Sequence, residues 1–156
     1  MVQGRWFPMG SDLSQPLAVR MAVFGTGRDA LDEGAQQVAV YDGEQPVGSA
    51  RLWWQDGAFW LGCVGVPEPF RGRGYGDLLV RLLLFKALTH SARVIRLEAP
   101  DGAASFFAQY GFQPESSRDG HTVMRLMGAD VRLSHCGGDC SACGHPSPEC
   151  APRALR

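Results

Sequence analysis

The 156-residue sequence lacks several features that would place it in a specialised class of proteins. No apolar run approaches the roughly 20 residues that a membrane-spanning helix needs, so we expect no membrane partner. The N-terminus has no basic-then-apolar signal layout, which makes the cytoplasm the expected location. The formal net charge is only −1, so no overall field favours nucleic acid or an acidic membrane as a partner. There is also no internal repeat.

What is present is typical of one globular domain. Hydrophobic residues make up 45% of the chain and charged residues 20%, a balance that allows a sizeable core. From about Ala129 the hydrophobic periodicity gives way to Gly, Ser, Pro and Cys. We therefore expect one domain over residues 1–128, followed by a cysteine-rich tail over residues 129–156.

The periodicity of apolar residues predicts an alternation of strands and helices. Strands are expected over 2–8, 37–41, 47–54, 58–66, 94–99, 112–114 and 121–127, helices over 14–25, 75–90 and 101–110, and an acidic loop over 28–35. The strand over 58–66 is nearly all apolar, which indicates a central position in the sheet. Because a helix connects it to the strand over 94–99, these two strands should run parallel.

A loop rich in glycine and arginine joins that central strand to the helix over 75–90. It reads Arg71-Gly72-Arg73-Gly74-Tyr75-Gly76. Its backbone N–H groups and the helix N-terminus suit an anion such as a pyrophosphate. Side chains would obstruct close approach of the backbone, which explains the glycines, and the two arginines can add charge-assisted hydrogen bonds.

Two motifs carry a resemblance to the GCN5-related N-acetyltransferase (GNAT) superfamily. The glycine loop matches that family's Gln/Arg-x-x-Gly-x-Gly/Ala acyl-CoA signature, which follows its fourth strand. The segment from Ala103 to Phe112 resembles its Ala-x-x-Phe-Tyr-x-x-x-Gly-Phe segment, which follows the fifth strand. The order of the expected elements agrees as well, over roughly residues 15–127.

The resemblance implies an α/β fold with a mixed, mostly antiparallel sheet, in which the fourth and fifth strands splay apart around acetyl-CoA. The residues implied to bind this co-substrate are Val64, Val66, Arg71, Gly72, Arg73, Gly74, Tyr75, Gly76 and Phe106. The backbone near Val64 and Val66 would pair with the pantetheine arm, and the Val64 N–H would polarise the thioester carbonyl.

The implied reaction is direct attack of a primary amine, on a small molecule or a peptide, on the acetyl-CoA thioester. Glu68 in the loop and Glu98 on the fifth strand are candidate general bases, although either could be a solvated carboxylate and a water-mediated base would leave no motif. Phe107 stands where the family often has a tyrosine as general acid. The alternative is therefore a catalytically weak acyl-CoA-binding module with a metal- or redox-responsive tail.

Other residues near the implied acceptor side have two interpretations each. The aromatic side chains of Trp53, Trp54, Phe59 and Trp60 either pack across strands or form an acceptor pocket. The carboxylates of Asp29, Asp32 and Glu33 either lie in a solvated loop or attract a cationic amine. Cys63 is either a buried small side chain or a thiol that lines the acetyl site.

The tail holds a cysteine cluster of Cys136, Cys140, Cys143 and Cys150. Four thiolates at this spacing suit tetrahedral zinc, while an iron–sulfur centre, disulfides and free thiols stay open. Exposed edge strands are also compatible with a homodimer.

Overall fold

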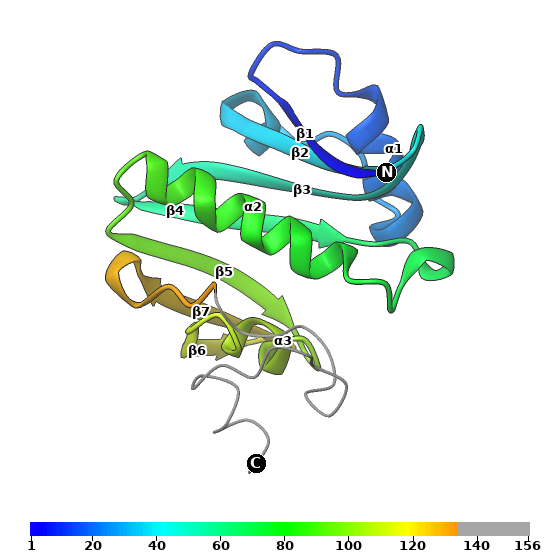
Figure 1. Ribbon diagram of the computed structural model, residues 1–156. Helices are drawn as coiled ribbons and strands as arrows, with labels where there is room; N and C mark the ends of the chain where they lie inside the picture. The colour runs from blue at the N-terminus through cyan, green and yellow to red at the C-terminus, as the bar shows by residue number, and fades with distance from the viewer. Residues whose placement is uncertain (134–156) are drawn as a thin grey trace.

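The computed structural model describes residues 1–133, which form one seven-stranded sheet with helices on both faces (Figure 1). The elements are β1 (Val2–Phe7), α1 (Ser14–Phe24), the 3-10 helix η1 (Ala30–Gly34), β2 (Ala35–Asp42), β3 (Gln45–Gln55), β4 (Ala58–Gly65), the 3-10 helix η2 (Glu68–Phe70), α2 (Tyr75–Thr89), β5 (Val94–Pro100), α3 (Ala104–Ala108), β6 (Gln113–Arg118), β7 (His121–Met127) and the 3-10 helix η3 (Gly128–Asp130).

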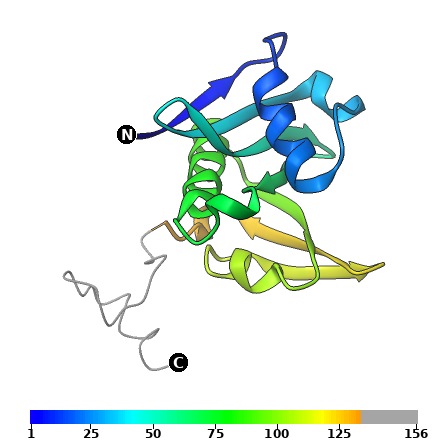
Figure 2. The ribbon, with the colours of Figure 1, turned by 90° about the vertical axis from the view of Figure 1, so that its right-hand side faces the viewer.

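The strand order is β1-β2-β3-β4-β5-β7-β6. Neighbouring strands pair antiparallel except β4 and β5, which pair parallel and are connected by α2. This confirms the predicted fold class and the central position of β4. In Figure 2, α1 and α2 lie on opposite sides of the sheet, so each of its faces is covered by one of the two longer helices.

The main core lies between the sheet and α2. Leu79, Leu83 and Leu84 of the helix are fully buried, and Leu61 of β4 and Leu97 of β5 belong to the same cluster. The spacing of the three leucines is that of one helical face, which is why this segment forms a helix against the sheet. The packing of α2 against β4 and β5 therefore fixes where the end of β4 lies relative to the helix.

Two predicted elements differ in the structure. The helix expected over 101–110 is only the short α3, because Gly102 adopts a left-handed φ of 89° and the Ala103 N–H bonds back to the Pro100 carbonyl in a turn. The acidic loop expected over 28–35 contains η1, and one of its carboxylates, Asp32, is buried.

The described residues after 128, the predicted domain boundary, still pack against the domain. Val131 and Leu133 pack against the core, and the Arg132 N–H bonds to the Tyr110 carbonyl. The four tail cysteines of the predicted zinc site, Cys136, Cys140, Cys143 and Cys150, lie outside the described residues. In the described part, none of the helices has the length and hydrophobicity needed to cross a lipid bilayer.

Candidate active site

β4 and β5 are paired over only a short stretch. Phe59, Trp60 and Leu61 lie opposite Ile95, Arg96 and Leu97, and in the described structure no later residue of β4 pairs with β5. Both strands nevertheless continue, to Gly65 and Pro100 respectively. Figure 1 shows them diverging toward the end of the sheet at which α2 begins. The edge of β4 that faces this opening is therefore available to a ligand.

A β-bulge lies in β4 where the pairing with β5 ends. Arg51 of β3 is opposite Gly62, but Ser49 is opposite Gly65, so Ala50 faces two residues of β4 instead of one. These two residues are Cys63 and Val64, and Cys63 has a left-handed φ of 51°. A bulge bends the strand and redirects its backbone groups. Here it turns the end of β4 away from β5, and both bulge side chains are half-buried.

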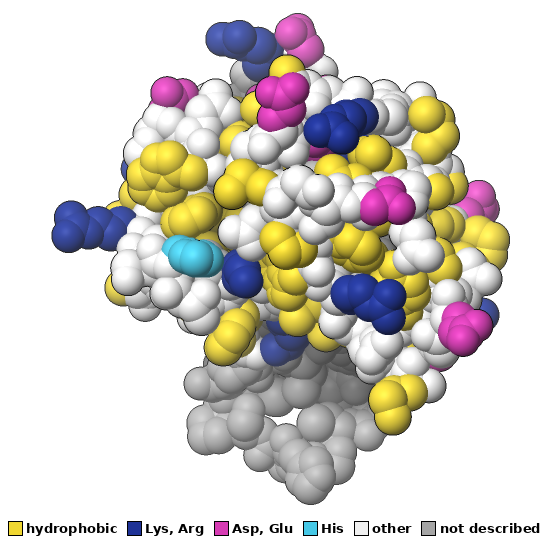
Figure 3. All heavy atoms as spheres, turned by 90° about the horizontal axis from the view of Figure 1, so that it is seen from above, with side chains coloured by type: hydrophobic (Ala, Val, Ile, Leu, Met, Phe, Trp, Pro, Cys, Tyr) yellow, Lys and Arg dark blue, Asp and Glu magenta, His cyan; other side chains and the backbone are white. Residues whose placement is uncertain are grey.

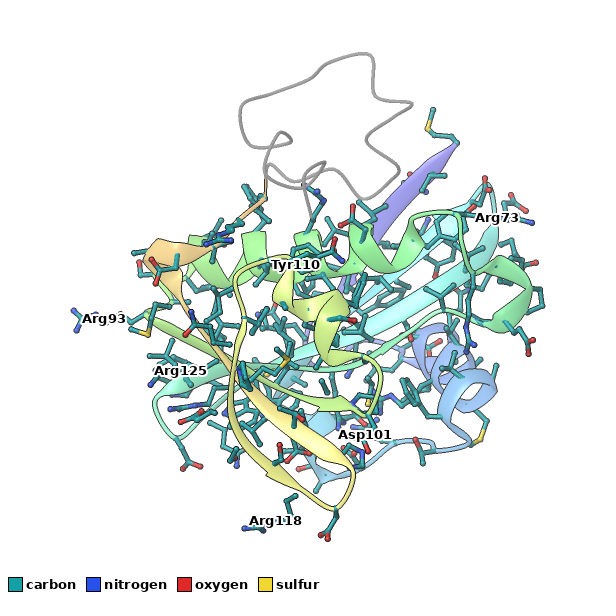
Figure 4. The ribbon with its side chains drawn as sticks, turned by 90° about the horizontal axis from the view of Figure 1, so that it is seen from below. Arg73, Arg93, Asp101, Tyr110, Arg118 and Arg125 are labelled. Atoms are coloured by element: carbon teal, nitrogen blue, oxygen red, sulfur yellow. The ribbon has the colours of Figure 1, made fainter. Side chains whose placement is uncertain are left out.

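The glycine loop wraps around the N-terminus of α2. Gly72 and Gly74 have φ values of 79° and 86°, a conformation that favours glycine, and Gly74 caps the helix without a side-chain hydrogen bond. The first N–H groups of α2 are therefore free of a side-chain cap. The Arg71 Nε donates to the Val66 carbonyl at 2.8 Å, which fastens the loop to the end of β4. Arg73 is exposed and projects from the edge of the molecule (Figure 4).

α3 approaches the same place from across the opening. A Cβ on Gly76 would lie 3.7 Å from Phe106 and 3.9 Å from Val66, so these three residues meet beside the N-terminus of α2. Phe106 is half-buried, whereas Phe107 is buried in the core and contacts Phe106 edge to face. The structure thus brings together the two motifs that are far apart in the sequence.

Tyr110 does not supply the hydroxyl that Phe107 lacks. Its side chain is fully buried, and its hydroxyl donates to the Asp77 carboxylate on α2. Asp77 also forms an i,i+4 ion pair with Arg81, at 2.8 Å. Tyr110 therefore joins α3 to α2.

The two candidate bases lie on different elements. Glu68 is exposed in η2, and among the described residues Arg71 forms no ion pair with it. Glu98 is exposed on β5, one residue beyond Leu97, the last position that pairs with β4. It lies on the sheet face opposite α2, because Leu97 points into the core. Glu98 is thus at the opening, while Glu68 is in the connection that leads to the glycine loop.

A buried polar network supports the opposite face of the sheet. The Arg20 guanidinium donates to both oxygens of Asp32, at 2.8 and 2.9 Å, and to Gln37 at 3.0 Å. Arg51 donates to Asp32 at 3.1 Å and to Asp29 at 2.6 Å. Burial alone would raise the pKa of Asp32, but the hydrogen bonds from Arg20 and the Asp29 N–H, with the Arg20 charge, hold it well below its usual range.

The sequence interpretation missed this network. Asp32 was expected to be either solvated or in contact with an acceptor, but it is fully buried and binds two arginines. The sequence feature that could have indicated a buried ion pair is Arg20, which shares a helical face with the buried residues Pro16 and Val19. Among the described residues, the Arg51 Nε is the only buried side-chain nitrogen or oxygen with no hydrogen-bond partner.

The described surface outside the opening includes a cavity, an exposed histidine and scattered charges. A cavity of about 490 Å³ lies between β6, β7 and the chain that follows them, lined by Gln113, Arg125 and Arg132 among others, away from the opening. His121 is exposed, and its ring contacts the Asp119 carbonyl. The face in Figure 3 shows both signs of charge scattered among apolar side chains, in keeping with a net charge close to zero.

Comparisons with known proteins agree with this geometry. Residues 33–114, more than half of the chain, match the family model described as an acetyltransferase (GNAT) domain. A curated relative, the uncharacterized N-acetyltransferase YjcF of Bacillus subtilis, is 30% identical over 91 residues, which are 58% of this chain and 65% of the relative. The match thus spans slightly less than two thirds of that relative's length.

Solved structures share the fold at low sequence identity. An acyl-CoA N-acyltransferase from Pseudomonas aeruginosa has a TM-score of 0.71 at 20% identity, covering 80% of this chain and 99% of the other. A GNAT family acetyltransferase from Elizabethkingia anophelis with acetyl-CoA bound has a TM-score of 0.69 at 12% identity, covering 81% and 97%. The diverging strands and the glycine loop at the start of α2 agree with this shared fold. The family model, which matches more than half of the sequence, shows that the chain belongs to the GNAT acetyltransferase family.

Proposed function

We propose that the protein is an N-acetyltransferase that transfers the acetyl group of acetyl-CoA to a primary amine of a small molecule or a peptide. The observation that carries the proposal is the opening between β4 and β5, which faces the uncapped N-terminus of α2. A helix N-terminus binds anions, and an unpaired strand edge binds an extended chain. One opening therefore offers both contacts that a nucleotide with a pantetheine arm requires.

The residues present fit acetyl-CoA as the co-substrate. The N–H groups of residues 71–76, together with the side chains of Arg71 and Arg73, would hold the pyrophosphate. The backbone of Val64 and Val66 would pair with the pantetheine amides, and Phe106 would pack against the arm. Gly76 supports this assignment, because a side chain there would extend toward Phe106 and Val66 and fill the space between them.

The chemistry that these groups allow is direct acyl transfer. The neutral amine attacks the thioester carbonyl carbon, the new C–N bond forms, the C–S bond breaks, and CoA leaves as a thiolate. The Val64 N–H, at the bulge, would donate to the carbonyl oxygen as negative charge develops on it. Glu98, or Glu68 through water, would accept the amine proton, and the thiolate, whose conjugate acid has a pKa of about 8.5, can leave without a tyrosine.

The proposal is tested by binding and turnover measured on the same protein. Calorimetry with CoA should show an affinity that falls at least tenfold in the double variant Arg71→Glu/Arg73→Glu. A matched control is Arg93→Glu/Arg118→Glu, which changes the net charge equally at two exposed arginines (Figure 4). Release of free thiol from acetyl-CoA, followed across a panel of amines, measures turnover. Unchanged CoA affinity in the first variant would overturn the proposal.

Phe107 favours a second candidate, an acyl-CoA-binding module with weak catalysis. Its signature would be tight CoA binding with no turnover on any amine of the panel. The cytoplasmic location, the homodimer and the zinc site of the tail stay predictions, which fractionation, light scattering and metal analysis of the purified chain can each test.

A further inference from the structure

Two tryptophans form an aromatic surface on the sheet face opposite α2. Trp53 of β3 and Trp60 of β4 are cross-strand partners, so both side chains lie on the same face. Their ring centroids are 6.3 Å apart and their planes differ by 17°. Both indole N–H groups donate to Gln55, at 2.9 and 3.2 Å, near the β3–β4 turn. The polar edges of the two rings are thus satisfied at one end of the surface.

The other end of this aromatic surface reaches the opening between β4 and β5. A Cβ on Gly62 would lie 2.6 Å from Cζ3 and 2.8 Å from Cη2 of Trp53, so the ring occupies the place of a side chain at this position. Gly62 follows Leu61, the last β4 residue paired with β5, and precedes the bulge. The six-membered ring of Trp53 therefore lies beside the β4 backbone at Gly62. In the proposed function, the thioester binds just beyond this point, at Val64.

Most charges around the aromatic surface are paired. The Arg51 guanidinium lies 5.1 Å from the Trp53 ring centroid and is paired with Asp29 and Asp32, and Asp32 is paired with Arg20 as well. Arg125 of β7 lies opposite Arg96 and is exposed. The Asp29 carboxylate is 50% exposed, so it also faces solvent. Across the opening, Arg96 is paired with Glu115 at 3.1 Å.

Glu98 completes this arrangement. It shares a face with Arg96, which lies opposite Trp60, and it forms no hydrogen bond or ion pair with any residue that the structure describes. An exposed carboxylate beside an aromatic surface favours a ligand that carries a cationic group next to an aromatic ring. Anionic and neutral polar acceptors gain nothing from either feature.

We infer that the acceptor is an aromatic primary amine, whose ring lies on Trp53 and Trp60 and whose ammonium lies between Asp29 and Glu98. This rests on the proposed function, because the adjacent thioester makes the bound amine an acceptor. The ammonium loses one proton to Glu98 or to water before the nitrogen attacks the carbonyl carbon. An aliphatic polyamine would satisfy the carboxylates but would leave the two rings without a matching partner.

The test compares amines that differ only in aromaticity. Thiol release from acetyl-CoA gives kcat/KM for 2-phenylethylamine, 2-cyclohexylethylamine and spermidine. Because ring–ring contacts add up to about tenfold beyond the buried area, 2-phenylethylamine should exceed its cyclohexyl analogue by up to about tenfold. Trp60→Leu should bring this ratio close to one without changing the affinity for CoA, and Trp54→Leu, 60% exposed on the other face, is the matched control.

The outcomes separate the two proposals. Equal rates for the aromatic and cyclohexyl amines, a preference for spermidine, or an unchanged ratio in Trp60→Leu would each overturn the aromatic acceptor while leaving the transferase intact. If no amine is turned over, tryptophan fluorescence titrated with 2-phenylethylamine still tests the surface. Quenching in the wild type and Trp54→Leu that is lost in Trp60→Leu would support it, and no saturable quenching would refute it. Should Trp60→Leu not fold, Trp53→Leu removes the other ring of the same surface and must bring the ratio of the two amines close to one.

Discussion

Replacing Asp32 by asparagine should destabilise the protein more than any other single change in the η1 segment. The carboxylate accepts five hydrogen bonds, from the Arg20 guanidinium, Gln37, Arg51 and the Asp29 N–H. An asparagine keeps the volume but removes the charge and presents an N–H₂ group to the donors around it. Arg20, whose side chain is 2% exposed, would then be a buried cation without its counter-ion.

The size of the effect follows from burial. Breaking a buried ion pair by removing one partner costs about 3–5 kcal/mol, a large part of the roughly 5–15 kcal/mol that holds a typical domain folded. Asp29→Asn is the matched control, because its carboxylate is half exposed and binds the same Arg51. Because water screens this half-exposed carboxylate, its replacement should cost about 1 kcal/mol. Urea unfolding at pH 7, followed by tryptophan fluorescence, measures both variants.

The pH dependence provides a second check on Asp32. Its pKa in the folded protein lies below the value near 3.8 expected for the unfolded chain, so the unfolded state binds the proton more tightly. The stabilisation is therefore complete at neutral pH and is lost as the pH falls from about 5 through the folded pKa. Between pH 5 and pH 3, the unfolding free energy of Asp32→Asn should therefore fall less than that of the wild type. A loss at pH 7 no greater than that of Asp29→Asn would refute the reasoning.

Three further predictions concern the site and its supports. Gly74→Ala places a side chain at a φ of 86°, so we expect a loss of about 1 kcal/mol in unfolding free energy and weaker CoA binding in calorimetry. Cys63→Ser should keep most of kcat, because direct attack needs no thiol; an acetylated Cys63 trapped by acid quench and found by mass spectrometry would contradict this. Tyr110→Phe removes the hydrogen bond to Asp77 and should lower stability by about 1 kcal/mol in thermal unfolding, with the affinity for CoA unchanged.

The sequence was sufficient to predict the elements that form the framework of the site. The all-apolar run of β4 and the leucine spacing of α2 are strong local signals, and they correctly predicted a central strand and a helical connection to a parallel neighbour. The glycine loop could also be recognised from the sequence, because backbone positions with left-handed φ values favour glycine. The roles of Val64, Glu68 and Glu98 in catalysis stay predictions.

Features that depend on contacts between distant segments could not be predicted. The network of Arg20, Asp32 and Arg51 joins three elements, and no periodicity shows which polar residues will be buried together. The place of Trp53 over Gly62 depends in the same way on the β3–β4 register. The sequence predicted too long a helix at α3, because the residues around Gly102 have a composition that suits a helix but form a turn.

The extra residue in β4 has a consequence for how the fold could be closed. If Cys63 were deleted, Ala50 would face Val64 alone, and every pair on either side would keep its present partner on β3. A straightened β4 could then continue alongside β5 toward Pro100, adding sheet hydrogen bonds where the strands now part. Such a shortened protein would resemble an ordinary closed sheet, firmer than the natural chain but without room for a substrate. On this reasoning, the width of the opening between β4 and β5 would depend on a single residue of additional chain length.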